Sequence, residues 1–456
     1  MNNVPVDPLL KEIASYFTNR GKQAYLVGGA VRDLLLGKKA ADWDLAVDAR
    51  PEEVMSMFRR VIPTGIKHGT VTVVYKGVSV EVTTFRTESG YSDGRRPDRV
   101  EYAPSIGEDL SRRDFTMNAL AARLPSGKLV DPFGGAADIK SGTIRCVGRP
   151  AERFSEDGLR PVRALRFASQ LGFSVERETL DAIPGALGIT AKVSPERIRD
   201  EFEKIVASGR PSTALLLMEK TGLLELLFPD LAQCRSIEQK GCHRYDVLDH
   251  SLLACDFAAR RQYSQTVRLA ALFHDLGKKP TLSIGPDGNR TFYQHERESV
   301  RLSRNILRQY RYPNAAIDAV AHLIGEHMFH YTEDWGDAAV RRFIARAGEE
   351  NLGELFRLRL ADAFGTSGAE PAADFLLPLI NRVEDALSKS RALSLKDLAV
   401  SGKDLIASGI KPGKHMGIIL NELLEAVLDD PALNSREKLL EIAEKINKRY
   451  YAPSFP

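Results

Sequence analysis

The sequence predicts an α+β protein in which a small mixed sheet flanked by helices is followed by a long helical region. Two patterns lead to this prediction. Short apolar and β-branched runs occur between residues 24 and 85, whereas from about residue 155 apolar residues recur at helical spacing between Gly and Pro breaks. Because 456 residues are too many for one hydrophobic core, we expect roughly two to four domains.

The composition is typical of a globular protein. The chain is 43% hydrophobic and 27% charged, and 64 basic against 61 acidic residues give a net charge of +3. This balance excludes intrinsic disorder and a polybasic coating protein, but it allows a local basic channel. No apolar run approaches the roughly 18 residues of a membrane helix, no signal peptide is visible, and the four cysteines form no C-x-x-C pair. We therefore expect a cytoplasmic protein with reduced thiols and no membrane partner.

The first elements alternate between strand and helix. Residues 24–27 are a short apolar run that ends at a Gly-Gly pair and leads into an amphipathic segment over 30–37, which predicts strand, turn and helix. Residues 42–48 alternate polar and apolar side chains like a strand. A helix is expected from Pro51, because proline favours the first helical turn.

Two more strands and a loop follow before the helical region. The β-branched runs at 70–76 and 78–85 are separated by a single glycine, which predicts a hairpin. The polar segment 87–98 is rich in turn residues and is predicted to be a mobile loop. Helical periodicity then dominates, most clearly over 159–173 and 195–209.

Asp42 and Asp44 are the residues that point most directly to chemistry. Two positions apart on the predicted strand, their carboxylates would leave the same face and could share divalent ions. Glu81, in the middle of a strand of the following hairpin, is placed to be a third ligand. Paired carboxylates at the end of a sheet suit phosphoryl transfer with two metal ions. The alternative, a solvated or turn-capping D-x-D pair, stays open on these residues alone.

The Gly28-Gly29 turn is a candidate phosphate site. Where it opens a helix, its bare amide N–H groups and the positive end of the helix dipole would face phosphate oxygens, and Arg32 would add a fork of donors. A Gly-Gly pair is more often only a turn. Its position about a dozen residues before the aspartate pair, in a strand–turn–helix–strand unit, favours the functional interpretation.

Five motifs, in chain order, resemble one enzyme family: GGAVRD (28–33), DWD (42–44), RRDFTMNAL (112–120), DPFGG (131–135) and RFSEDGLRPVRALRF (153–167). They are similar to class II tRNA nucleotidyltransferases, the CCA-adding enzymes, which share their catalytic head with bacterial poly(A) polymerases. The resemblance runs from about residue 24 to residue 205. It implies an enzyme that adds C and A from CTP and ATP to the 3′ end of tRNA, without a nucleic-acid template, and that releases pyrophosphate.

The resemblance also assigns residues of the head. It implies that the triphosphate and its Mg²⁺ ions are held by Gly28, Gly29, Arg32, Asp42 and Asp44. Arg113 is similar to the family's nucleotide-contacting arginine. The alternative for that segment is a surface ion pair of Arg112 or Arg113 with Asp114. The Gly-rich segment 131–142 resembles the family's hinge between head and neck, although an ordinary loop has the same composition.

Four residues of the last motif are predicted to act in base selection. Spaced by three, Asp157, Arg160, Arg163 and Arg166 would form one stripe on a helix, and the repulsion among the arginines calls for an anion or a ligand unless the face is merely solvated. In the family, the Asp and the first Arg of this motif bind the incoming base. A carboxylate that accepts from the exocyclic amine and a guanidinium that donates to the ring nitrogen suit cytosine and adenine, but not uracil or guanine. The other two arginines would contact phosphates or hold Asp157 in place.

The polar loop over 87–98 bears on which bases are added. Family members that add only CC have a shortened loop here, whereas this chain keeps the loop in full, including RRP at 95–97. CC-only activity is therefore disfavoured. An A-adding enzyme and a poly(A) polymerase remain alternatives.

Seven of the nine histidines fall between residues 243 and 330. Their order, H…HD…H…H followed by an Asp, resembles the HD phosphohydrolase superfamily, whose imidazoles and carboxylates suit divalent transition metals that activate water. The resemblance implies a metal-binding set of His250, His274, Asp275, His295, His327 and Asp362. A hydrolase acting on RNA ends or small phosphoesters is thus a second alternative function. We expect His243, His322 and His330 to be hydrogen-bonded core residues instead.

These motifs divide the chain into four predicted parts. They are a catalytic head (1–140), a helical neck for base recognition (141–210), a helical body with the HD module at about 243–365 (211–370) and a helical RNA-binding tail (371–456). The body and tail would grip tRNA by its shape and phosphate charge rather than by its sequence.

Overall fold

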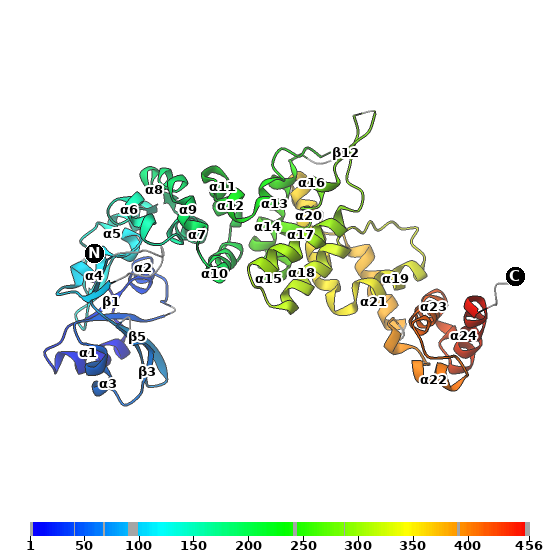
Figure 1. Ribbon diagram of the computed structural model, residues 1–456, viewed down its shortest axis with the longest axis horizontal. Helices are drawn as coiled ribbons and strands as arrows, with labels where there is room; N and C mark the ends of the chain where they lie inside the picture. The colour runs from blue at the N-terminus through cyan, green and yellow to red at the C-terminus, as the bar shows by residue number, and fades with distance from the viewer. Residues whose placement is uncertain are drawn as a thin grey trace. The chain divides into compact units, whose positions relative to one another are not determined.

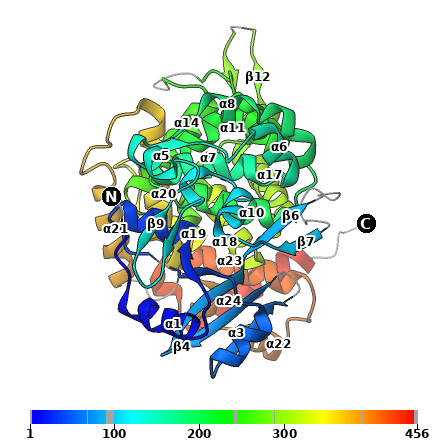
Figure 2. The same ribbon diagram turned by 90° about the vertical axis from the view of Figure 1, so that its left-hand side faces the viewer.

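The computed structural model describes residues 3–40, 42–66, 69–89, 99–239, 244–286, 288–389 and 393–451 (Figures 1 and 2). The chain divides into two compact units. Unit 1 comprises Met1–Gln233 and Ile306–Tyr312, and unit 2 comprises Cys234–Asn305 and Pro313–Pro456.

A seven-stranded mixed sheet forms the N-terminal part of unit 1. Its strand order is β3-β4-β5-β2-β1-β8-β9. β2 and β5 run parallel, and the other neighbouring strands are antiparallel. The strands are β1 (Ala24–Val27), β2 (Asp44–Val47), β3 (Val61–Gly65), β4 (Thr70–Tyr75), β5 (Val78–Thr84), β8 (Ala121–Arg123) and β9 (Lys128–Val130). The helices among them are α1 (Pro8–Thr18), α2 (Gly29–Leu35) and α3 (Pro51–Met57). The α+β class predicted from the sequence is confirmed.

The predicted hairpin is present, and its turn explains its register. Lys76 and Gly77 both have positive φ, at 49° and 82°, as a two-residue turn between twisted strands requires. The strand predicted over 42–48 is shorter than expected. β2 begins at Asp44, so Asp42 precedes the strand. Part of the predicted loop is also strand: β6 (Arg86–Ser89) pairs antiparallel with β7 (Arg99–Tyr102). The rest of that loop, 90–98, lies outside the described residues.

Further short helices of unit 1 lie after β7 in the chain. Several begin with proline in the first turn, where its missing N–H costs no hydrogen bond. They are α4 (Ile106–Ser111), α5 (Gly135–Ser141), α6 (Pro150–Glu156), α7 (Arg160–Leu171), α8 (Arg177–Asp181), α9 (Leu187–Thr190), α10 (Pro195–Val206), α11 (Pro211–Thr221), α12 (Leu223–Leu227) and α13 (Pro229–Ala232), with the 3₁₀ turns η2 (Thr116–Asn118) and η3 (Pro184–Ala186). Two short parallel strands, β10 (Thr143–Ile144) and β11 (Ser174–Val175), lie among these helices. The expectation that this region is purely helical is therefore wrong.

Unit 2 is helical apart from the short antiparallel pair β12 (Ser283–Ile284) and β13 (Arg290–Thr291). Its helices are α14 (Val247–Arg260), α15 (Gln265–Phe273), α16 (Lys278–Thr281), α17 (His295–Gln309), α18 (Asn314–Glu326), α19 (Asp337–Ala347), α20 (Leu352–Ser367), α21 (Leu377–Lys389), α22 (Gly402–Ala407), α23 (His415–Asp429) and α24 (Arg436–Tyr451), with the 3₁₀ turns η4 (Glu349–Asn351), η5 (Leu395–Asp397) and η6 (Pro431–Leu433). The last residues of α17 belong to unit 1. α14 packs along both α15 and α20.

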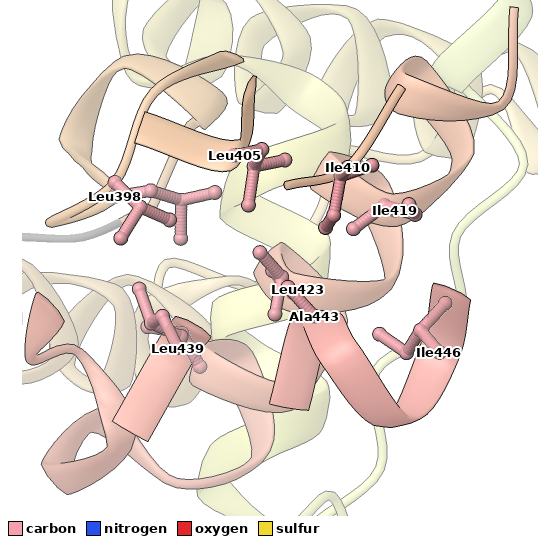
Figure 3. Close-up of a cluster of buried hydrophobic side chains, with 10 residues drawn as sticks. Leu398, Leu405, Ile410, Ile419, Leu423, Leu439, Ala443 and Ile446 are labelled. Carbon is pink, nitrogen blue, oxygen red and sulfur yellow. The ribbon is translucent and has the colours of Figure 1, made fainter. Parts of the chain in front are cut away.

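The C-terminal helices share a hydrophobic core of their own. Figure 3 shows aliphatic side chains from α22, α23 and α24 directed toward one another. The labelled members are Leu398, Leu405, Ile410, Ile419, Leu423, Leu439, Ala443 and Ile446, all of them buried. Within the described ranges, none of the helices combines the length and the apolar character that a membrane crossing demands.

Candidate active site and metal-binding cluster

A polar cavity of about 530 Å³ lies in unit 1, and it gathers residues that are far apart in the sequence. Its walls come from the ends of β1, β2 and β5, the start of α2, the segment after α4, and α7. The predicted residues that line it are Gly28, Gly29, Arg32, Asp44, Glu81, Arg113, Asp157, Arg160, Arg163 and Arg166. Asp42 is exposed beside β2 and is not among the described lining residues.

Asp44 and Glu81 are direct neighbours in the sheet. They are paired in the parallel register of β2 and β5, and paired residues of adjacent strands direct their side chains to the same face. Removal from water raises the pKa of Asp44; the charges of Glu81 and Asp42 raise it further, while Arg113 opposes them. The neighbouring carboxylates thus disfavour ionisation of Asp44, and a divalent cation would offset their charge, because hard cations prefer oxygen ligands.

Gly28 and Arg113 meet on one side of the cavity. Gly28 precedes α2 with a φ of +69°, a backbone conformation that requires glycine, and a Cβ there would lie 2.9 Å from Nη1 of Arg113. Arg113 donates to Asp109 at 3.2 Å, and its buried Nε has no hydrogen-bond partner within the described chain. Arg112 also pairs with Asp109, at 2.8 Å. The sequence left open an ion pair of Arg112 or Arg113 with Asp114 as an alternative; the described ion pairs of both arginines are with Asp109 instead.

Asp114 instead connects the head to α7. Its Oδ2 accepts from Arg163 Nε at 2.8 Å, and its Oδ1 accepts from Asn118 Nδ2 at 3.2 Å. Asn118 in turn accepts from Arg32 Nη1 at 2.8 Å. Burial by itself would raise the pKa of Asp114, but the charge and hydrogen bond of Arg163 lower it to about 2. Asp114 is thus an anion that fixes two arginines of the cavity.

The expected single helical stripe is interrupted. α6 ends at Glu156 and α7 begins at Arg160, so Asp157 lies in the break between two helices and not on one face with the arginines. Its Oδ1 accepts the Leu159 N–H at 3.0 Å. The contact of this segment with α9 depends on Gly158, where a Cβ would lie 2.6 Å from the Ile189 carbonyl oxygen.

The three arginines of α7 are neither solvated nor unpaired. Arg160 pairs with Glu156 and donates to two backbone carbonyls, those of Arg153 at 2.8 Å and Arg112 at 3.2 Å. Arg166 pairs with Glu201 at 2.6 Å. Acidic partners therefore offset the repulsion among the arginines that was expected from the sequence.

Phe167 lies against three guanidinium groups of the cavity. The guanidinium carbon of Arg166 lies 3.5 Å from the centre of its ring, and those of Arg32 and Arg163 lie at 5.1 and 5.6 Å. Arginines stack favourably on aromatic faces, so this buried ring stabilises cations from both α2 and α7.

Asp157 is held by a residue that sequence reasoning missed. Arg197 on α10 donates to both of its oxygens, at 3.1 and 2.7 Å, whereas Arg163 and Arg166 pair with Asp114 and Glu201. The four-residue spacing of Arg197 and Glu201 puts them on one helical face, which was the available signal. Their partners lie 35 and 40 residues away, beyond any local pattern.

Unit 2 brings all six residues of the predicted metal-binding set together. They come from α14, the end of α15, the start of α17, the end of α18 and α20, and all are buried. The contacts are His250 Nε2 to His274 Nε2 at 3.0 Å, His250 Nε2 to Asp362 Oδ1 at 3.2 Å, His274 Nε2 to Asp275 Oδ2 at 3.4 Å, His295 Nε2 to Asp275 Oδ1 at 3.3 Å and His327 Nε2 to Asp275 Oδ1 at 4.0 Å.

The hydrogen bonds of three imidazoles prepare them as metal ligands. Nδ1 of His274, His295 and His327 contacts the carbonyl oxygen three residues earlier, at 2.9, 3.0 and 2.6 Å. A carbonyl only accepts, so each Nδ1 carries a proton and each Nε2 faces the cluster, where it can ligate a metal once it is deprotonated. Nε2 of His295 is buried and lies 3.3 Å from Asp275 Oδ1, without a hydrogen bond of good geometry among the described residues. Nitrogen and carboxylate donors in this arrangement fit a divalent transition metal.

The surroundings lower the pKa of two members of the cluster, His327 and Asp275. Burial, together with the neighbouring His274, lowers the pKa of His327 to about 3, so its ring is neutral and able to ligate. Burial opposes ionisation of Asp275, yet His274 and Lys278 hold the pKa of this carboxyl well below its usual range. Lys278 Nζ donates a hydrogen bond to Asp275 Oδ2 at 2.7 Å, and Arg359 Nη1 donates one to Asp362 Oδ2 at 2.6 Å.

The remaining body histidines differ in their surroundings. His322 contacts the Ala347 carbonyl oxygen at 2.6 Å through Nε2, as expected of a hydrogen-bonded residue. His330 is exposed, so the expectation that it belongs to the core is wrong. It lies beyond the end of α18, where the helical pattern that motivated the expectation has stopped. His243 lies outside the described residues.

Comparison with family models identifies three segments. Residues 24–145 match "Poly A polymerase head domain", 172–234 match "Probable RNA and SrmB- binding site of polymerase A", and 297–443 match "tRNA nucleotidyltransferase domain 2 putative". Among curated proteins, the chain is 35% identical over 432 residues to the CCA-adding enzyme of Lactobacillus helveticus, covering 94% of each chain. It is 36% identical over 436 residues to the CCA-adding enzyme of Anoxybacillus flavithermus, again covering 94% of each.

Solved structures agree with these matches. The crystal structure of the Bacillus stearothermophilus CCA-adding enzyme in complex with CTP superposes with a TM-score of 0.73 at 32% identity, covering 98% of this chain and 100% of that one. The Thermotoga maritima CCA-adding enzyme complexed with tRNA shares the fold, with a TM-score of 0.59 at 22% identity and 97% and 96% coverage.

Proposed function

The chain belongs to the family of class II CCA-adding enzymes and poly(A) polymerases, and on that premise we propose how its own residues carry out nucleotide addition. The protein is a CCA-adding tRNA nucleotidyltransferase, with tRNA, CTP and ATP as its partners. It joins C and A to the 3′ end of tRNA without a nucleic-acid template and releases pyrophosphate. The proposals below concern the residues, the metals and the second cluster.

Asp42, Asp44 and Glu81 would hold Mg²⁺. The proposal is supported by the pairing of Asp44 with Glu81 across β2 and β5 and by the raised pKa of Asp44 among like charges. When bound, Mg²⁺ would acidify the RNA 3′-hydroxyl and stabilise the charge that develops on the triphosphate. Asp42 would reach this group from the segment before β2.

The triphosphate would lie at the Gly28-Gly29 turn, between Arg32 and Arg113. The glycine backbone leaves room for close approach, and the unpartnered Nε of Arg113 is a donor ready for an anion. Asp157 and Arg160 would select the base from the opposite wall of the cavity. The body and tail would bind the RNA through its shape and phosphate charge. We propose that the reaction takes place in the cytoplasm, which is consistent with buried cysteines that form no disulfide at Cys146, Cys234 and Cys255.

One observation carries the proposal: acidic residues suited to Mg²⁺ and the acid–arginine pair suited to base recognition line the same cavity. The test is to incubate the purified protein with tRNA that lacks its 3′ end, supplying each NTP singly and in pairs. Incorporation of both C and A that stops after about three nucleotides is expected. Addition of A alone, or a long poly(A) tail, would reject this specificity.

Substitution of Asp44 tests the metal assignment. Because a lost ligand displaces the ions from the reacting groups, Asp44→Ala is expected to lower kcat of nucleotide addition by at least about 100-fold. Asp181→Ala, at an exposed residue of α8 outside the cavity, is the control and should leave kcat unchanged. Wild-type kcat in Asp44→Ala would remove Asp44 from the metal site.

The assembled histidine–aspartate cluster favours a second candidate activity. We propose that His250, His274, Asp275, His295, His327 and Asp362 hold a divalent transition metal, with phosphoester hydrolysis as the chemistry this donor set suits. His274→Ala should abolish metal retention and any hydrolysis of RNA 2′,3′-cyclic phosphate ends, and it should leave nucleotide addition intact. Asp44→Ala should do the reverse. Loss of both activities in either variant would contradict two independent sites.

A further inference from the structure

Arg197 occupies a position next to the base-selecting pair without lining the cavity. It lies on α10 and contacts Asp157 in a bidentate manner, Nη1 to Oδ1 at 3.1 Å and Nη2 to Oδ2 at 2.7 Å. Its side chain is 22% exposed, so the pair is substantially enclosed and poorly screened by water. Two parallel N–H···O bonds fix the plane of a carboxylate as well as its position.

The hydrogen bonds of Asp157 leave it with a single free acceptor site. Each carboxylate oxygen accepts about two hydrogen bonds. Oδ1 receives the Leu159 N–H at 3.0 Å and Arg197 Nη1, whereas Oδ2 receives only Arg197 Nη2. Within the described part of the chain, one lone pair of Oδ2 thus remains for a ligand.

The hydrogen bonds of Arg160 likewise leave only part of its guanidinium group available to a ligand. Nη1 donates to the Arg153 carbonyl oxygen and to Glu156, and Nη2 donates to the Arg112 carbonyl oxygen. Its Nε and the second hydrogen of Nη2 stay available among the described contacts. Asp157 and Arg160 line the same cavity, so together they offer one acceptor beside one or two donors.

We propose that Arg197 is a positioning residue that sets the base specificity of the enzyme. By engaging both oxygens of Asp157, it holds the carboxylate in one orientation and leaves one acceptor beside the Arg160 donors. That arrangement matches the exocyclic amine and ring nitrogen of cytosine and adenine. It rejects uracil and guanine, whose carbonyl oxygen and ring N–H would each meet a like group. The inference rests on the proposed role of Asp157 and Arg160.

Without Arg197 the carboxylate of Asp157 would be free to rotate and to present either oxygen. A rotated carboxylate can accept the ring N–H of uracil, so discrimination should fall more than overall activity. A purely structural role for Arg197 would instead lower the efficiency with every nucleotide alike. The ratio of efficiencies for right and wrong bases therefore separates the two roles.

The experiment compares Arg197→Gln with Arg199→Gln on tRNA lacking its 3′ end. Arg199 lies on the same helix and donates to the Arg311 carbonyl oxygen at 2.8 Å, away from Asp157, so it is a matched control for the loss of an arginine. For Arg197→Gln the ratio of kcat/KM with CTP to that with UTP should fall about 10-fold or more. For Arg199→Gln the ratio should stay at its wild-type value.

Two further variants keep the test decisive. Arg197→Lys keeps the charge without the fork and should give an intermediate ratio, and it serves if Arg197→Gln does not fold. In an Asp157→Ala background, Arg197→Gln should cause no additional loss of the ratio, because the carboxylate that Arg197 holds is gone. An unchanged ratio in Arg197→Gln, or equal losses with CTP and UTP, would overturn the inference. A wild-type enzyme that adds neither C nor A would instead overturn the proposed function.

Discussion

Individual charges in the cavity of unit 1 are held by specific partners rather than by solvent. Asp114 binds Arg163, Glu201 binds Arg166, and Asp157 binds Arg197. Each pair joins segments distant in the sequence, and each is partly or fully buried. Removing one member of such a pair leaves the other desolvated and uncompensated, which costs more than the pair contributes.

Asp114 gives a pH-dependent prediction. Because its pKa is lowered to about 2 in the folded state, its stabilising contribution is complete above the ordinary Asp pKa and is lost as the pH falls toward 2. The free energy of unfolding of the wild type should exceed that of Asp114→Asn at pH 6. The excess should shrink by about 1 kcal/mol between about pH 6 and pH 3, as urea unfolding followed by circular dichroism would measure.

The control for this prediction is Asp181→Asn. Asp181 is 64% exposed and its partner Arg177 is 95% exposed, so solvent screens the pair. Its difference from the wild type should not change with pH. An equally pH-independent difference for Asp114→Asn would show that the carboxylate is not held as an anion by Arg163.

At the level of elements, the break between α6 and α7 sets the position of Asp157. Proline at position 161 and the Asp157 carboxylate bonded to the Leu159 N–H start α7 anew. Gly158 packs directly on the backbone of α9, and Thr190 Oγ1 donates to its carbonyl oxygen at 2.8 Å. One missing Cβ thus permits the contact that locates the segment carrying Asp157.

Gly158→Ala should disturb this contact. Its Cβ would lie 2.6 Å from the Ile189 carbonyl oxygen and 2.9 Å from the Thr190 nitrogen, both backbone atoms that have no side-chain freedom to move away. We expect a loss of about 2 kcal/mol in the free energy of unfolding and a lower kcat/KM for CTP and ATP. Gly188→Ala on α9, where the new Cβ meets nothing within 4 Å, should change neither quantity. Equal effects of the two variants would contradict the packing argument.

For the whole molecule, each compact unit contains its own chemical site. The cavity with Asp44 and Asp157 is built within unit 1, and the histidine–aspartate cluster is built within unit 2. A metal bound to the cluster would cross-connect α14, α15, α17, α18 and α20, so its binding energy would stabilise unit 2. None of the six ligands belongs to unit 1.

Metal removal therefore gives a prediction for the complete protein. A chelator, in Mg²⁺-free buffer, should lower the thermal transition of unit 2 by about 10 °C and leave that of unit 1 unchanged in calorimetry, because a ligand at a large excess over its Kd contributes about 3 kcal/mol. His274→Ala should start from the lower transition and show no response to the chelator. Elemental analysis of the purified protein should find about one transition metal per chain or more. A metal-free wild type with no chelator response would exclude the site.

Much of the architecture follows from local sequence patterns. The hairpin around Gly77, the strand before Gly28 and the helices that begin at Pro51 and Pro195 all follow from backbone preferences over a few residues. The ligand types also follow locally, because their order and spacing resemble known motifs: the predicted cavity residues except Asp42, and all six residues of the metal-binding set, converge in space. Such signals are local, so one sequence suffices to see them.

Only the tertiary structure decides which charges face one another. The partners Arg197, Glu201 and Asp109, and the close approach of Gly158 to α9, depend on how helices pack. The expected single stripe is wrong because α6 ends at Glu156 and α7 begins at Arg160, which leaves Asp157 between the two helices. The physical reason is that periodicity specifies the face of an element, whereas an ion pair across some 40 residues depends on burial and on the relative placement of two elements, neither of which leaves a mark on local spacing.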